Sequence, residues 1–319
     1  MTIRDAFLWG REHLAATGVA EPAIEADLLL RRALGWDRAQ MYTRWDSPLD
    51  GGAWDRYRVL LDARAGGRPV HYILGEREFM GLLFAVDERV LIPRPETEVL
   101  TEVIIDFLNG NREQRTGNSQ SQEVRSPFPV PRSRQLVVDV GTGSGCIAVA
   151  IAHFVPDAAV IATDISRGAL DVAASNARRH GVESRIEFLE GDLLTPLPQS
   201  VQREIDVLVS NPPYVPPQDA AGLPREIREF EPTIAVVGQE DGLAVHRRLI
   251  SEGTRWLKPG GLLALEVGTG QALAVAGWFR EADYAVIRTI QDYAGIDRVV
   301  TATYAPESTQ GTLIVLANT

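Results

Sequence analysis

One stretch decides the fold: Leu136-Val137-Val138-Asp139-Val140-Gly141-Thr142-Gly143-Ser144-Gly145. Its first five residues form an apolar run that predicts a buried strand, and a helix is expected directly afterwards, over residues 146–154. The glycines between them let the backbone and a ligand approach closely, and the new helix N-terminus adds N–H donors. Alone, a glycine-rich turn is a weak signal, which predicts only a ligand at the end of this strand.

The next predicted strand makes the prediction of a ligand site more specific. It is expected over residues 159–163 and ends at Asp164, where a carboxylate can accept hydrogen bonds from both ribose hydroxyls of an adenosine. Alone, Asp164 is equally well explained as a surface charge. Cys146 stands where a dinucleotide fingerprint needs its third glycine, so a nicotinamide dehydrogenase is the weakest option. Strand, GxGxG, helix, strand and Asp resemble the Rossmann-like, class I S-adenosylmethionine-dependent methyltransferases.

Further strands follow in regular alternation with helices. They are predicted over residues 185–189, 205–209, 262–267, 284–290, 298–304 and 311–316, the last two as a hairpin at the sheet edge. Asp192, behind the third strand, is placed to reach the adenine amino group, and Leu193 to pack on the ring. In an open α/β sheet the carboxyl ends of the strands form the ligand crevice, so the marked residues should converge there.

The fourth strand leads into Asn211-Pro212-Pro213-Tyr214. Two prolines stiffen this corner, and because they lack an N–H, they leave backbone carbonyls uncommitted. The corner therefore presents the Asn211 amide and a free carbonyl beside the flat ring of Tyr214, an arrangement that suits a planar –NH2 group. Alone, Asn-Pro-Pro is more simply a stiffened loop without chemistry. The donor-type site upstream favours the chemical interpretation.

The N-terminal part has a different character. Helical spacing of apolar residues predicts a small bundle over residues 1–75, a hairpin linker over 76–92 with Gly81 at its turn, and an α/β domain over 93–319. A helix over roughly 96–109 is followed by a polar stretch, 109–134, which we interpret as a flexible insertion. The bundle fits either a protein partner or a stabilising cap.

Composition excludes several classes. The net charge is −11, and residues 1–90 hold 12 Arg against 14 Asp and Glu, so broad binding to nucleic acid is not expected. Cys146 is the only cysteine, which excludes intramolecular disulfides and zinc clusters, and no metal is expected. No apolar run is long enough for a membrane helix, and no signal peptide opens the chain. We therefore expect a cytoplasmic protein without membrane association.

The assembled motifs resemble the peptide chain release factor N5-glutamine methyltransferases, the PrmC/HemK family. The resemblance covers nearly the whole chain apart from residues 109–134. Asn-Pro-Pro-Tyr is shared with amino methyltransferases of DNA and RNA, whereas the run from Leu91 to Glu98 is far more specific. The stretches that carry the resemblance are Gly75-Glu76-Arg77-Glu78-Phe79, Leu91-Ile92-Pro93-Arg94-Pro95-Glu96-Thr97-Glu98, Gly141 to Gly145, Asn211 to Tyr214, Phe230-Glu231-Pro232, Asp292-Tyr293 and Asp297-Arg298-Val299.

The resemblance implies a fold, a donor and a substrate. The fold is a seven-stranded mixed sheet with helices on both faces, joined by the hairpin to the helical bundle. The substrate is the glutamine of the Gly-Gly-Gln motif in class 1 release factors, methylated by S-adenosyl-L-methionine, which leaves as S-adenosyl-L-homocysteine. The implied donor-binding residues are Gly141, Thr142, Gly143, Ser144, Gly145, Asp164, Asp192, Leu193 and Asn211; those gripping the glutamine are Asn211, Pro212, Pro213 and Tyr214.

Two departures from the family pattern stand out. Leu193 replaces an aromatic residue found in some relatives, which weakens stacking on adenine but keeps apolar contact. The family commonly has a Gly-Gly pair before Asp-Gly, and here Gly238-Gln239-Glu240-Asp241-Gly242 keeps one glycine of that pair. The second departure bears on the conformation of this loop more than on the activity.

An amide nitrogen is a poor nucleophile because its lone pair is delocalised into the carbonyl. Our hypothesis is a direct in-line methyl transfer in which Asn211 and Pro212 are the catalytic residues. The Asn211 side-chain oxygen and the Pro212 carbonyl would accept both N–H bonds of the glutamine amide and so position its nitrogen. No general base is required, since the proton can leave after the transfer.

Other functions stay open. An amino methyltransferase of DNA or RNA would share the corner, but it predicts a basic target-binding region that the chain does not supply. A ribosomal-protein glutamine methyltransferase would share the chemistry. A non-catalytic S-adenosylmethionine-binding partner of the translation machinery would bind the donor without transferring its methyl group.

Overall fold

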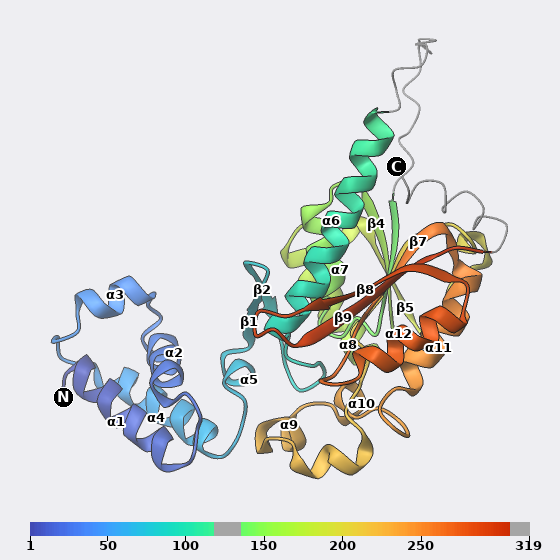
Figure 1. The fold of residues 1–319 in the computed structure, drawn as a ribbon. Coiled ribbons are helices and arrows are strands. Elements are labelled where there is room, and N and C mark those ends of the chain that lie inside the picture. The colour runs from blue at the N-terminus through green and yellow to red at the C-terminus, as the bar shows by residue number, and fades with distance from the viewer. Residues whose placement is uncertain (118–134, 307–319) are drawn as a thin grey trace, which may run out of the picture.

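The computed structural model describes residues 1–117 and 135–306 (Figure 1). The N-terminal helices form a bundle of their own, set beside a larger part in which helices flank a twisted sheet (Figure 1). The bundle consists of α1 (Ile3–Ala16), α2 (Pro22–Leu34), α3 (Arg38–Thr43), α4 (Gly51–Ala65) and α5 (Val70–Leu74). Its helices share one apolar core, in which Leu14, Leu30 and Tyr57 are fully buried.

A short hairpin follows the bundle. Strands β1 (Glu76–Phe79) and β2 (Leu82–Ala85) pair antiparallel around Met80-Gly81, and both turn residues have positive φ. The predicted turn at Gly81 is therefore confirmed. Phe79 and Phe84 are buried against each other at a ring separation of 6.0 Å, and they join the core beneath the helices of the larger part.

The expected seven-stranded mixed sheet with helices on both faces is confirmed. Its strand order is β5-β4-β3-β6-β7-β9-β8. The first five strands in this order run parallel to one another, and β9 is antiparallel to both of its neighbours. The strands are β3 (Gln135–Val140), β4 (Ala158–Asp164), β5 (Ile186–Glu190), β6 (Ile205–Ser210), β7 (Leu257–Glu266), β8 (Tyr284–Gln291) and β9 (Asp297–Tyr304).

Alternate residues of the central strands enter different cores, as the two-residue period of a strand requires. Val137 and Val207 pack on one face with α6 (Pro95–Gly117) and α7 (Cys146–Phe154). Val138 and Leu208 pack on the other face with α11 (Ala244–Trp256) and α12 (Ala272–Glu281). The remaining helices are α8 (Arg167–Arg179), α9 (Arg225–Phe230) and α10 (Thr233–Val236), and short 3₁₀ helices cover Glu183–Arg185, Gln199–Val201 and Pro217–Gly222.

Two sequence predictions need correction. Helix α6 continues to Gly117 instead of ending near residue 109, because residues 110–117 contain no proline to stop it. The rest of the predicted insertion, 118–134, lies outside the described residues. The edge hairpin is formed by β8 and β9, and since β9 is paired on both sides, it has no free edge for the predicted partner at 311–316, which also lies outside the described residues.

Within the described parts of the chain, no helix combines the length and the apolarity needed to span a bilayer.

One buried amide ties the hairpin to the sheet. Asn176 on α8 accepts a hydrogen bond from the Ala85 backbone N–H at 2.8 Å and donates to the carbonyls of Ala85 at 3.0 Å and Ser144 at 2.8 Å. It thus completes β2 as a neighbouring strand would, and it holds the glycine-rich turn at the same time.

We therefore expect Asn176→Ala to lower the free energy of unfolding by about 2–3 kcal/mol, because the buried carbonyl of Ser144 and the partly buried N–H and carbonyl of Ala85 lose their partner. Urea denaturation monitored by circular dichroism measures this change. Ser175→Ala, at the exposed neighbouring position, is the matched control and should change stability by less than about 0.5 kcal/mol. Equal midpoints for the two variants would contradict the role given to Asn176.

Candidate active site

The strand order reverses between β3 and β6, and a cavity of about 230 Å³ opens there at the carboxyl ends of the strands. The reversal places three loops together, because Val140 pairs with Thr163 on one side and Ser210 on the other. Eight of the predicted site residues line the cavity: Gly141, Gly143, Asp164, Asp192, Leu193, Asn211, Pro212 and Pro213. Thr142, Ser144, Gly145 and Tyr214 do not line it.

Asp164 stands at the end of β4 with each oxygen already bonded to the backbone. Oδ2 accepts from the Gly143 N–H and Oδ1 from the Ser166 N–H, both at 2.9 Å. Burial raises the pKa of this carboxyl, and the backbone donors oppose the shift. The two bonds fix the plane of the carboxylate, so its remaining lone pairs have a set direction toward a ligand.

Thr142 and Asp139 brace the turn from behind. The Thr142 hydroxyl donates to Oδ2 of Asp139 at 2.6 Å, and the Ala148 N–H donates to the same oxygen at 3.2 Å. Burial raises the pKa of Asp139 to about 7. The predicted binding residue Thr142 thus holds the shape of the turn from inside the fold.

Asp192 and Leu193 line the cavity, and the sequence did not reveal the ion pair of the first or the backbone conformation of the second. The Asp192 carboxylate forms a two-pronged ion pair with Arg248 of α11, at 2.9 and 3.2 Å. Leu193 has a positive φ of 49°, a conformation that costs about 1–3 kcal/mol for such a residue. Its carbonyl accepts a hydrogen bond from the Thr163 hydroxyl at 2.9 Å, which helps to hold the side chain against the cavity.

The Asn211 corner is oriented from the side of α6. Nδ2 of Asn211 donates to the Thr97 hydroxyl at 3.0 Å, and that hydroxyl donates to Oε2 of Glu266 at 2.6 Å. Thr97 and Glu266 are buried, and burial raises the pKa of Glu266 to about 7. Among the described residues none donates a hydrogen bond to the Pro212 carbonyl. The corner therefore carries an oriented amide and an uncommitted carbonyl, as its prolines predicted.

Tyr214 supports the corner. Its backbone carbonyl accepts a hydrogen bond from Nε2 of Gln271 at 2.9 Å. Burial raises the pKa of its phenol to about 12, so the ring is neutral at physiological pH.

The loop over residues 238–242 packs directly on the corner. A Cβ on Gly238 would lie 2.8 Å from the Pro213 carbonyl oxygen, and one on Gly242 would lie 2.3 Å from that of Tyr214. Both glycines are therefore required by close approach, and the chain retains both. The departure from the family pattern falls on Gln239, whose side chain lines the cavity.

Sequence reasoning missed several residues at this site. Thr97 lies in the run that resembles a family signature and Glu266 lies within the predicted strand 262–267, but neither was predicted as a site residue. Ile165 is 56% exposed although it lines the cavity, so it offers an uncovered apolar surface beside Asp164. The sequence did hold a signal for Ile165, which is an apolar residue directly after the acidic end of a predicted strand. Nothing in the sequence connected Arg248 to Asp192.

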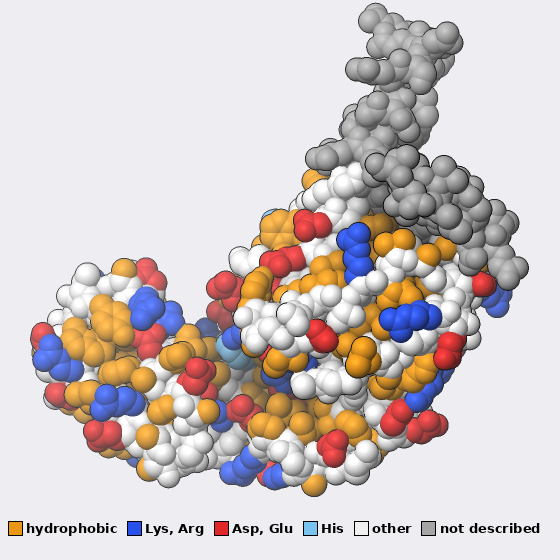
Figure 2. All heavy atoms as spheres, in the orientation of Figure 1, with side chains coloured by type: hydrophobic (Ala, Val, Ile, Leu, Met, Phe, Trp, Pro, Cys, Tyr) orange, Lys and Arg blue, Asp and Glu red, His pale blue; other side chains and the backbone are white. Residues whose placement is uncertain are grey.

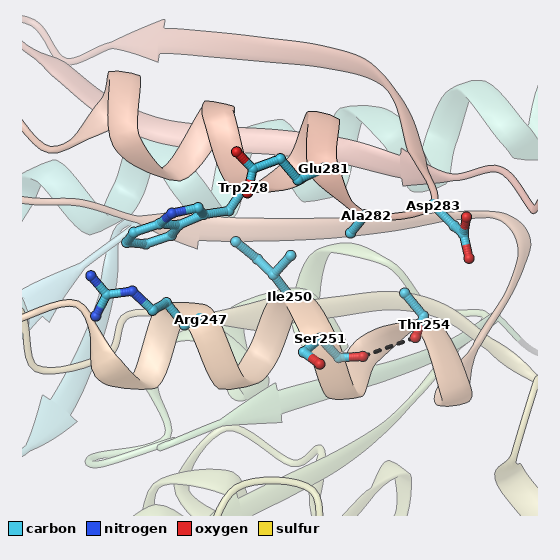
Figure 3. A pocket seen from close by; sticks show the side chains of 8 residues that line it. All are labelled: Arg247, Ile250, Ser251, Thr254, Trp278, Glu281, Ala282 and Asp283. Atoms are coloured by element: carbon cyan, nitrogen blue, oxygen red, sulfur yellow. Dashed lines mark hydrogen bonds between the residues drawn. The ribbon is translucent and has the colours of Figure 1, made fainter.

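A second cavity, of about 410 Å³, is open to solvent between α11 and α12 (Figure 3). Its edge is formed by the Arg247 guanidinium, which lies 4.3 Å from the centre of the Trp278 ring, and the Thr254 hydroxyl bonds within its own helix to the Ser251 carbonyl. None of the predicted site residues lines it. The cavity at the strand ends is therefore the candidate active site.

Comparison with known proteins agrees with this geometry. Residues 5–75 match the PrmC N-terminal domain, and residues 124–223 match the Methyltransferase small domain. The catalytic domain of hMettl16, in complex with MAT2A 3′UTR hairpin 6, superposes with a TM-score of 0.53 over 78% of this chain and 83% of that one. At 15% identity this likeness concerns the fold alone. The sheet, its helices and this likeness together identify the class I S-adenosylmethionine-dependent methyltransferase fold.

Full-length relatives are more similar. A release factor glutamine methyltransferase of Geobacter sulfurreducens is 40% identical over 299 residues, which are 94% of this chain and 95% of that protein. One of Moorella thermoacetica is 40% identical over 93% of this chain and 97% of its own length. Identity at this level over nearly the whole length of both proteins shows that this chain belongs to the release factor glutamine methyltransferase family.

Proposed function

We propose that this protein transfers a methyl group from S-adenosyl-L-methionine to the side-chain nitrogen, N5, of the glutamine in the Gly-Gly-Gln motif of class 1 peptide chain release factors. The observation that carries the proposal is the oriented Asn211 amide, which lines the same cavity as Asp164 and the glycine-rich turn. One cavity thus joins a site for the donor to a site for an –NH2 group.

The residues at the strand ends fit the donor. Asp164 has fixed acceptor lone pairs for the ribose hydroxyls, and Gly141 and Gly143 line the cavity without side chains of their own. Ile165 and Leu193 offer apolar surface to adenine, and Asp192, which lines the same cavity and is paired with Arg248, would accept a hydrogen bond from its amino group. When bound there, S-adenosylmethionine supplies a methyl group on a sulfonium sulfur, an electrophile that the protein need not activate.

The corner fits the acceptor. Two acceptors, Oδ1 of Asn211 and the Pro212 carbonyl, match the two N–H bonds of a primary amide. Bonding both hydrogens holds the nitrogen in place, and the two oxygen dipoles favour the positive charge that develops on it. Because the burial of Tyr214 keeps its phenol neutral, we assign this ring to packing and not to proton transfer.

We propose that residues 1–75 dock the release factor, that 76–92 are a linker and that 93–319 catalyse the transfer. The bundle is tied to the elements beside the cavity: Arg64 of α4 contacts Glu25 within the bundle and Glu226 of α9 at 2.7 Å. Arg68 pairs with Glu88 behind the hairpin at 3.2 Å. These ion pairs support a bundle held against α9 and against the segment that follows the hairpin. Since release factors act on ribosomes, the reaction would take place in the cytoplasm.

The charge distribution disfavours a nucleic-acid target. Figure 2 shows basic and acidic side chains interspersed over the face that it draws, without a continuous basic area. Arg64, Arg94 and Arg248 are each paired with carboxylates and are not free for phosphate contacts. Phosphate binding depends on unpaired cations, so a protein target suits this surface better.

The substrate assignment is tested by incubating the protein with S-adenosylmethionine and a class 1 release factor. Mass spectrometry of the Gly-Gly-Gln peptide should show one added methyl group on the glutamine. A release factor with Gln→Ala in that motif should gain none, and duplex DNA or ribosomal RNA in its place should stay unmodified. Methylated nucleic acid together with an unmodified release factor would contradict the proposal.

Asn211→Ala removes one of the two acceptors. We expect kcat to fall at least about 100-fold, because the amide loses its positioning, while the dissociation constant for S-adenosylmethionine changes by less than about 5-fold. Single-turnover methylation and isothermal titration calorimetry measure the two quantities. A turnover within about threefold of the wild type would contradict the role given to Asn211.

Asp164→Ala should weaken S-adenosylmethionine binding by about 10- to 100-fold, because the ribose loses charged acceptors. Calorimetric titration measures the loss. Asp171→Asn is a suitable control, since Asp171 is an exposed carboxylate on the same loop-and-helix segment, paired with Arg167, and it should leave the affinity unchanged. Unaltered affinity in the Asp164 variant would contradict the assigned donor site.

A further inference from the structure

Three side chains from distant segments form one hydrogen-bonded chain behind the corner. Asn211 follows β6, Thr97 lies in the first turn of α6, and Glu266 ends β7. Thr97 is 2% exposed and Glu266 is fully buried. Oε1 of Glu266 has no hydrogen-bond partner among the described residues. A buried carboxyl with an unpaired oxygen destabilises a fold, and this one is separated from Asn211 by a single hydroxyl.

The donor and the acceptor in each of these two hydrogen bonds follow from the number of protons that the three side chains carry. An ionised carboxylate only accepts hydrogen bonds, so the Thr97 hydroxyl must spend its one proton on Glu266. Toward Asn211 the hydroxyl then offers lone pairs alone, and Asn211 must turn its –NH2 group to it. Because the amide is planar, Oδ1 faces away from Thr97. No described residue donates a hydrogen bond to Oδ1, which leaves it available to a substrate.

We propose that Thr97 and Glu266 are positioning residues, which lock the Asn211 amide with its oxygen, and not its nitrogen, toward the –NH2 group of the substrate. The proposal rests on the function proposed above and deepens it. With the amide flipped, an N–H group would face the N–H groups of the glutamine, and no hydrogen bond would form. The unfavourable burial of Glu266 is thus explained by its role, which is to fix the orientation of the Asn211 amide.

The first test compares variants of Thr97. Thr97→Val keeps the shape of the side chain and removes its hydroxyl, so we expect kcat to fall about 10- to 100-fold while the KM for the donor stays within about twofold. Thr97→Ser keeps the hydroxyl and should restore most of kcat. Thr101→Val is the matched control, because Thr101 is fully buried one turn later and its hydroxyl bonds only to the Thr97 carbonyl, at 3.1 Å.

These variants separate positioning from packing. A kcat loss in Thr97→Val that Thr97→Ser repairs and Thr101→Val does not share supports the proposal. Equal kcat values for Thr97→Val and Thr97→Ser would overturn it, as would an equal loss in Thr101→Val, since the loss would then follow from removing any buried hydroxyl on α6.

The second test uses pH, because a neutral carboxyl can donate as well as accept and no longer fixes the chain's direction. Burial raises the pKa of Glu266 to about 7. The ionised carboxylate therefore fixes the orientation of the Asn211 amide above this pH, and the neutral carboxyl no longer fixes it below. Ionisable side chains that face Glu266 or interact with it come from several elements: Arg94 just before α6, Glu96 in its first turn, Cys146 of α7, Tyr214 of the corner, His246 of α11 and Arg298 of β9.

We expect the wild-type kcat, at saturating donor and substrate, to fall as the pH decreases from about 8 to 6. Glu266→Gln should show a low kcat that does not depend on pH over this range. Asp139 is a second buried carboxyl with a pKa of about 7, and a fall that persists in Glu266→Gln would assign the titration to such a group and overturn the role of Glu266.

A third readout does not depend on the substrate. In the ¹⁵N–¹H spectrum the side-chain amide of Asn211, assigned by its absence in Asn211→Ala, should have one proton shifted by the bond to Thr97. The shift should persist in Thr97→Ser and disappear in Thr97→Val. A wild type that shows this signature but methylates no release factor would refute the proposed substrate and not the lock. An unchanged amide spectrum in Thr97→Val would refute the lock.

Discussion

The parallel pairing of β3 with β6 is the constraint on which the site depends. Val140 and Ser210 are register partners, and the Ser210 hydroxyl donates to the Val140 carbonyl at 2.7 Å. The residues that follow these two strands, Gly141 and Asn211, are therefore held at one edge of the sheet. Since the strand order reverses at this pair, the helices diverge and leave a cavity between the two loops. The sites that we propose for the donor and for the acceptor meet because of this one pairing.

The segment from Leu91 to Glu98 connects the remaining parts to that edge. Arg94 pairs with the buried Glu231 at 2.6 Å, Thr97 bonds Asn211, and Glu98 accepts from the Met80 N–H at 2.8 Å. This one segment thus contacts the loop before α10, the Asn211 corner and the hairpin. The two family signatures Pro93 to Glu98 and Phe230 to Pro232, which are far apart in the sequence, are physical partners.

The sequence was sufficient for the sheet, the hairpin turn and the convergence of the strand ends, because each depends on local patterns of apolar residues, glycine and proline. It was not sufficient for contacts between distant segments. The pairing of Asp192 with Arg248 and the chain from Asn211 to Glu266 join residues more than 50 positions apart, and no local pattern encodes them. The end of α6 was wrong because polar residues without a proline do not stop a helix. The edge hairpin was wrong because β9 pairs with both β7 and β8, which local patterns did not reveal.

The proposed function depends most on one contact, in which Oδ1 of Asn211 accepts a hydrogen bond from the –NH2 group of the target glutamine. A neutron crystal structure of the complex with S-adenosyl-L-homocysteine and a Gly-Gly-Gln peptide tests it most directly, because deuterium positions distinguish the amide oxygen from the nitrogen. We expect Oδ1 of Asn211 at about 2.9 Å from the glutamine nitrogen, with the deuterated amide nitrogen of Asn211 directed at Thr97. Deuterium on the Asn211 atom that faces the glutamine would contradict it.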